Sequence, residues 1–128
     1  MELDYTVSTE KSHADAVAAV IEKTAAHGFR VQFVHDVQET LAEKGFARDP
    51  LTIVEMCNAK YASQVLAADP KIGLMLPCPI MVYVEGGKTL ISTMRPTLIG
   101  NFFPEAGIGD VAAEVERVLV AVIDEAAA

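Results

Sequence analysis

The chain has 128 residues, 52% of them apolar and 22% charged, which is enough length and hydrophobicity to bury one core. Its net charge is −8 and its 10 basic residues are scattered, which argues against nucleic acid or an anionic membrane as a partner. It contains neither the roughly 18 consecutive apolar residues of a membrane span nor a secretory signal at residues 1–4. We therefore expect one cytoplasmic domain over residues 1–128, with both cysteines as reduced thiols.

The first third of the chain predicts a strand, a helix and a second strand. Residues 2–7 alternate apolar and polar side chains, as in a half-buried strand. Ser12 and Asp15 form a capping box, and the helix that they begin ends at Gly28. Residues 29–35 then predict a second strand. Its period of two assigns four side chains to one face: Phe29, Val31, Phe33 and His35.

The middle of the chain predicts a short helix, a strand and a longer helix. Asp36 caps the short helix, which ends before Gly45. Residues 51–57 are nearly all apolar, which is typical of a strand covered on both faces. Asn58 then caps a helix that extends through Ala68.

A tight β-hairpin is predicted over residues 80–94. Two strands, 80–85 and 88–94, flank a Gly-Gly pair that permits the positive φ angles of a two-residue turn. Such a turn pairs Glu85 with Lys88 and sets the register of the pairs that follow.

The last third combines an unusual connection with a helix. Residues 97–109 form a long connection that is too apolar for solvent, so we expect it to cover a pocket, pack on its own domain or meet a second subunit. Phe102 and Phe103 are its candidates for a lid or a dimer contact. Asp110 caps the final helix. Together the elements predict an α+β fold, a mainly antiparallel sheet with helices packed on it, in the order β-α-β-(α)-β-α-β-β-α.

Several local patterns of this chain occur together in one known family. They are Gly28-Phe29, Cys57-Asn58 at a strand end, the helix around Ala62 and Leu66, Leu76-Pro77-Cys78, and Val82-Tyr83 leading to the glycine hairpin and Pro96. In this combination they resemble the uncharacterised family known as domain of unknown function 302, over most of residues 1–96. The resemblance implies a fold shaped like one half of the TATA-binding protein, often found as a dimer, and no established activity. It does not imply DNA binding, because fold is not function and the charge of this chain is unsuited to it.

Both cysteines are predicted at strand ends, where side chains are free to meet a ligand. In a regular strand Glu55 and Cys57 share a face, so a carboxylate and a thiol project together. With Cys78 nearby and His35 at another strand end, these groups are candidate ligands for zinc or copper. Asn58 is first an N-cap and second an amide donor beside the thiol. The plainer interpretation is two packed structural thiols, because no metal-binding motif is present.

Three functions stay open. The first is a homodimeric domain that binds a small molecule or a metal ion near Cys57 and Cys78, with no cofactor identified. The second is an enzyme that uses one of these thiols as a nucleophile or redox centre. The third is a structural or partner-binding module without a small-molecule site. The first two require the two sulfur-bearing side chains to meet at one end of the sheet.

Overall fold

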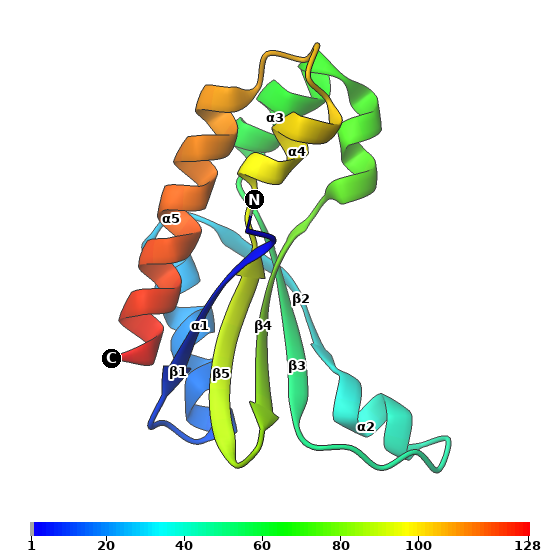
Figure 1. Cartoon of the computed structure of the whole chain (residues 1–128), viewed down its shortest axis with the longest axis vertical. Helices are drawn as coiled ribbons and strands as arrows, with labels where there is room; N and C mark the ends of the chain where they lie inside the picture. Colours follow the sequence, from blue (N-terminus) through cyan, green and yellow to red (C-terminus); the bar gives the residue numbers. More distant parts are fainter. Residues whose placement is uncertain (1) are drawn as a thin grey trace.

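The computed structural model describes residues 2–128 and has an α+β fold, in which a five-stranded antiparallel sheet has the strand order β1-β5-β4-β3-β2 (Figure 1). The strands are β1 (Asp4–Thr9), β2 (Arg30–Asp36), β3 (Leu51–Cys57), β4 (Cys78–Glu85) and β5 (Lys88–Met94). The helices are α1 (His13–Ala26), α2 (Val37–Ala42), α3 (Ala59–Ala68), the 3₁₀-helix η1 (Pro70–Met75), α4 (Thr97–Phe102) and α5 (Gly109–Ala127). The expected fold class and order of the main elements are therefore confirmed.

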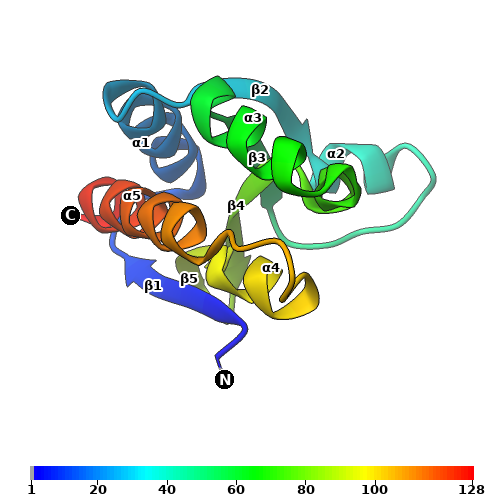
Figure 2. The same cartoon turned by 90° about the horizontal axis from the view of Figure 1, so that it is seen from above.

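The main core lies between one face of the sheet and the helices α1 and α5. Seen from above, these two helices lie together on one side of the sheet (Figure 2). Alternate residues of the central strands point into this layer, and the fully buried ones are Val54, Met56, Ile80, Val82 and Ile91. Burying one such side chain contributes about 1.5–3 kcal/mol, so this layer dominates the stability of the fold.

Three helices begin where the sequence predicts an N-cap. Ser12, Asp36 and Asn58 each accept a hydrogen bond from the backbone N–H three residues further on, at 3.0–3.2 Å. The capping interactions are local, and for this reason the sequence alone locates these helix starts.

The β-hairpin also has the predicted register. Glu85 pairs with Lys88, and the ladder continues from there to the pair of Met81 and Ser92. The two glycines of the turn have φ angles of 59° and 79°, which side chains with a Cβ rarely adopt.

A β-bulge in β2 corrects the predicted faces of this strand. The pairing register shifts between Val31 and Phe33, so the alternation of side chains moves by one residue. Phe29 and Val31 pack against the main core, whereas Phe33 pairs with Glu55 on the opposite face and is 57% exposed.

The strand β3 has the expected bounds, but helices do not cover both of its faces. Buried and half-buried residues alternate along it, with Thr52, Val54 and Met56 buried. The helices α1 and α5 cover that face, and the opposite face carries the half-buried residues Leu51 and Ile53. The prediction that helices cover both faces of β3 is therefore wrong, although its residues are nearly all apolar.

Two further corrections concern the segment before α5. The expected connection over residues 97–109 contains the short helix α4. The helix α5 begins at Gly109, so Asp110 lies in its first turn, and the N-cap Ile108 makes no side-chain capping bond. Within residues 2–128, no helix has both the length and the hydrophobicity that a bilayer crossing requires.

Candidate functional site

The end of the sheet near α3 brings the two cysteines together. Cys57 is the last residue of β3 and Cys78 the first of β4, and the register pairs Cys78 with Met56, the neighbour of Cys57. Antiparallel pairing thus places the end of one strand beside the start of the next. Both cysteines are free thiols, half-buried, and both line the same cavity.

This cavity lies between the end of the sheet and the helices α3, α4 and α5. Its lining side chains are chiefly apolar: Phe29, Cys57, Asn58, Tyr61, Ala62, Val65, Leu76, Cys78, Pro96, Ile99, Ile108, Val111, Ala112 and Val115. The space open to the centre of a water-sized sphere is about 40 Å³. One water needs roughly 10–15 Å³ by this measure, so the cavity has room for a few atoms only.

The polar side chain of Asn58 is engaged by the protein itself. Its amide nitrogen donates to the carbonyl of Gly28 at 3.2 Å, and its amide oxygen accepts from the backbone N–H of Tyr61 at 3.2 Å. The ring of Tyr61 packs against Phe29, with centroids 6.0 Å apart. Asn58 therefore caps α3 and ties it to the end of α1, as its first interpretation predicts.

The environment of Cys78 keeps its thiol protonated. Burial raises the pKa of Cys78 to about 11, and the charge that Cys57 would carry adds to the increase. Reactive cysteines have a lowered pKa, because the thiolate is the nucleophile and the metal ligand. Cys78 thus has the properties of a structural thiol.

The other two candidate residues lie away from this cavity. Glu55 pairs with Phe33 and Pro79 on the face of the sheet that has no helix. His35 pairs with Ile53, and its ring nitrogen lies 3.3 Å from the hydroxyl of Thr40 near the opposite end of β2. Among residues 2–128, no group of three or more His, Cys, Asp or Glu side chains is placed to hold a metal ion.

The segment between β5 and α5 forms one wall of the cavity. Pro96, Ile99 and Ile108 contribute lining side chains from it, and both isoleucines are buried. Phe103 packs against the cluster that contains Ile99, whereas Phe102 is 69% exposed. The apolar composition of residues 97–109 is the sequence signal that locates this wall.

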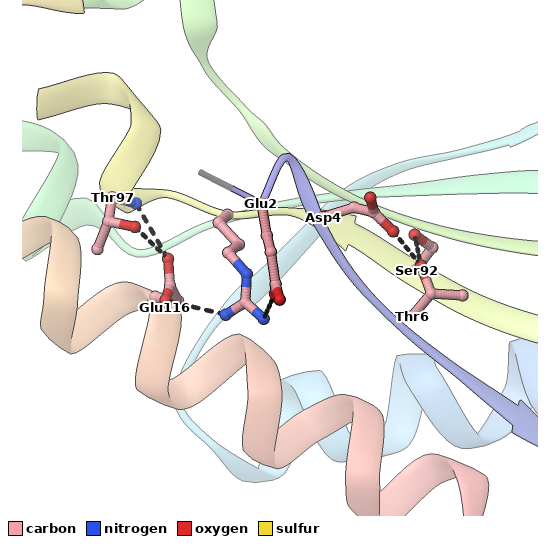
Figure 3. Close-up of polar contacts among 7 residues, drawn as sticks. Glu2, Asp4, Thr6, Ser92, Thr97 and Glu116 are labelled. Carbon is pink, nitrogen blue, oxygen red and sulfur yellow. Dashed lines mark hydrogen bonds and ion pairs between the residues drawn. The ribbon is translucent and has the colours of Figure 1, made fainter. Parts of the chain in front are cut away.

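A polar network attaches α4 to α5 (Figure 3). One carboxylate oxygen of Glu116 accepts from the hydroxyl of Thr97 at 2.6 Å and from its backbone N–H at 3.2 Å. The other accepts from Arg95 at 3.3 Å, and Arg95 also donates to Glu2 at 3.0 Å. The guanidinium of Arg95 lies 5.5 Å from the ring centroid of Tyr5.

Glu116 compensates for a missing cap. The N-cap residue of α4 is Pro96, which makes no side-chain capping bond. Burial by itself raises the pKa of Glu116, but hydrogen bonds from Thr97 and Arg95 outweigh burial, so this pKa lies below its ordinary value. The ionised carboxylate thus satisfies free donors of the first turn of α4.

The chain is similar to known proteins in both sequence and structure. The family model described as "Domain of unknown function DUF302" matches residues 5–126, and so extends through α5. The chain also resembles a protein of known crystal structure, an uncharacterized conserved protein DUF302 from Bacillus stearothermophilus. The two sequences are 31% identical, and the structures match with a TM-score of 0.93 over 98% of this chain and 99% of that one. No curated protein matches the chain.

Proposed function

The chain belongs to the DUF302 family, and from that premise we propose that it is a binding module whose cavity at Cys57 and Cys78 holds a small apolar group. One observation carries this proposal: helices from three parts of the chain and the end of the sheet surround a half-open pocket with almost no polar surface. The side chains around this pocket leave a recess in a part of the molecule that is otherwise closely packed.

The chemistry of the lining defines the ligand class. Asn58 is the amide in the lining, and its hydrogen bonds go to Gly28 and Tyr61. The other lining residues are chiefly apolar and include both cysteines, and such a lining favours apolar and polarisable groups. The volume of about 40 Å³ suits a single heavy atom or a short alkyl group, whereas an apolar cavity known to bind benzene has about 150 Å³.

The enzyme and metal alternatives have less support. A nucleophilic or metal-binding Cys78 would have to lose its proton, and its pKa of about 11 opposes this at neutral pH. Neither of the other candidate ligands lines the cavity: His35 lies toward the far end of β2, and Glu55 pairs with Phe33 and Pro79 on the helix-free face of the sheet. An apolar ligand requires neither deprotonation nor a third ligand.

Xenon tests the proposal, because it enters dry apolar cavities without needing a polar partner. Xenon dissolved under pressure should shift the methyl resonances of Val65, Ile99 and Val115, which line the cavity. In the variant Ala112→Leu a larger side chain fills the space, and the shifts should disappear. Ala113→Leu is the matched control, because Ala113 is the exposed neighbour on α5. Unshifted methyl groups in the wild-type protein would overturn the proposal.

A further inference from the structure

We propose that residues 97–108, which comprise α4 and the turn before α5, form a lid that opens as one unit and closes on a group bound in the pocket. This inference rests on the proposed function, because the lid gains a packing partner only when the pocket is occupied. The lid lies beyond the end of the sheet, on the same side as α3 and η1 (Figure 1). The pocket that it borders is half-open, so the lid has room to close further.

Two side chains of the lid have a double role. Ile99 and Ile108 are buried in a small hydrophobic cluster with Val65 of α3 and Ile72 of η1, which is distinct from the main core. Both isoleucines also line the pocket. A group bound in the pocket therefore contacts the same side chains that hold the lid in place. These added contacts favour the closed lid, because each apolar pair at van der Waals distance contributes a small attraction.

The lid depends on its neighbours for its stability. Its helix has six residues, and a helix of this length is not stable alone in water. Among the helices and strands, α5 is its main neighbour. Glu116 of α5 binds Thr97 at the start of α4, whereas Phe102 at the other end of this helix is 69% exposed. Segments with few buried contacts open locally, at a lower free energy than global unfolding requires.

Gly100 makes the lid easier to open than its surroundings require. It lies inside α4, and its φ angle is not positive. A Cβ at this position would meet no atom of residues 2–128 within 4 Å, apart from its own helix, so alanine fits there. Glycine inside a helix is less favourable than alanine, because it loses more backbone freedom on folding. The structure thus has space for a more stable α4 than the sequence provides.

An occupant of the pocket should oppose the opening of the lid by an amount that its affinity determines. Opening moves Ile99 and Ile108 away from Val65 and so removes one wall of the pocket. A ligand that binds only the closed form lowers the opening constant by the factor 1 + [L]/Kd. The expected effect on the lid therefore follows from the Kd and the ligand concentration alone.

Amide hydrogen exchange of the full chain under xenon pressure tests the proposal. Lid amides that donate to backbone carbonyls report the opening, among them those of Leu98, Ile99, Phe103 and Ala106. Without xenon, we expect them to share one opening constant and to exchange faster than the amides of the main core. The methyl shifts of Val65 give the Kd of xenon in the same sample. At ten times this Kd, the exchange of the lid amides should slow about 11-fold.

The helix α2 is the control within the same sample. It also has six residues, and its exchange should not respond to xenon, because Leu41 and its neighbours in α2 do not line the pocket. Gly100→Ala should slow the exchange of the lid about 2- to 5-fold without xenon, as expected for this substitution inside a helix. Gly73→Ala is the matched control variant, because Gly73 lies in η1 and a Cβ there makes an ordinary contact of 3.5 Å with Leu66. It should leave the exchange of the lid unchanged.

The possible results distinguish a failure of the lid from a failure of the binding site. If xenon shifts the methyl resonances but leaves the exchange of the lid unchanged, the lid proposal is wrong and the binding module stands. If xenon shifts no methyl resonance, the proposed function fails and the lid proposal fails with it. Lid amides that exchange as slowly as the main core, or that Gly100→Ala does not slow, would overturn the lid proposal alone.

Discussion

Glu116 on α5 accepts hydrogen bonds from both the hydroxyl and the backbone N–H of Thr97 on α4. The two residues belong to different helices, and their contact fixes the first turn of α4 against α5. Because Ile99 in this helix lines the cavity, the pair also positions one wall of the proposed binding site.

Removal of this carboxylate should loosen α4. We expect Glu116→Ala to lower the free energy of unfolding by about 1.5–3 kcal/mol, because bonds to a charged, mostly buried acceptor are lost. The amides of residues 97–103 should exchange with deuterium faster than in the wild-type protein. Glu114→Ala is the control, since Glu114 forms an exposed ion pair with Arg117, and it should leave the exchange of α4 unchanged. Equal exchange rates in both variants would contradict this role of Glu116.

The same carboxylate predicts a loss of stability in acid. The pKa of Glu116 in the folded protein lies below its ordinary value of 4.5. Its contribution to stability is therefore complete above the unfolded-state pKa and is lost as the pH falls through the folded-state pKa. Denaturant unfolding of wild type and Glu116→Gln should show a difference in stability that is largest at neutral pH and shrinks below pH 4.5. A difference that grows in acid would count against the assignment.

Cys78 should react slowly with alkylating reagents. A pKa of about 11 in place of 9.0 leaves about 100-fold less thiolate at neutral pH, and only the thiolate attacks. Mass spectrometry of peptides after timed treatment with iodoacetamide measures this rate, with the unfolded protein as the reference for both cysteines. Rapid modification of Cys78 near neutral pH would instead favour a thiol-dependent enzyme.

Enlarging the cavity should change which ligands it accepts. Ile99→Ala removes a buried lining side chain and should cost about 2–5 kcal/mol of stability. The added space should allow benzene to bind, as measured by an increase of the melting temperature with benzene. Leu98→Ala is the matched control, because Leu98 is equally buried on α4 but does not line the cavity. It should be destabilised without any stabilisation by benzene.

Local interactions made much of the fold predictable from the sequence. The caps at Ser12, Asp36 and Asn58 and the hairpin turn depend on residues within a few positions of one another. The bulge between Val31 and Phe33 was missed because no glycine or proline marks it, and it changed the face on which Phe33 lies.

The candidate site was predictable only in part, because strand direction decides which ends of strands meet. Antiparallel pairing puts Cys57 opposite Arg30 and His35 opposite Ile53, so His35 and Cys57 lie at different ends of β2 and β3. The sequence did indicate the two thiols and the apolar segment that covers them. No sequence pattern predicts the contact of Glu116 with Thr97, because this contact depends on how α4 and α5 pack against each other.

Diffraction from a crystal of the wild-type protein under xenon pressure shows whether the cavity binds an apolar atom. We expect one strong xenon peak in the cavity between Cys57, Cys78 and Ala112, and none there in crystals of Ala112→Leu. If the wild-type crystal has no xenon density in this space but binds xenon elsewhere, the cavity is not a binding site for apolar groups.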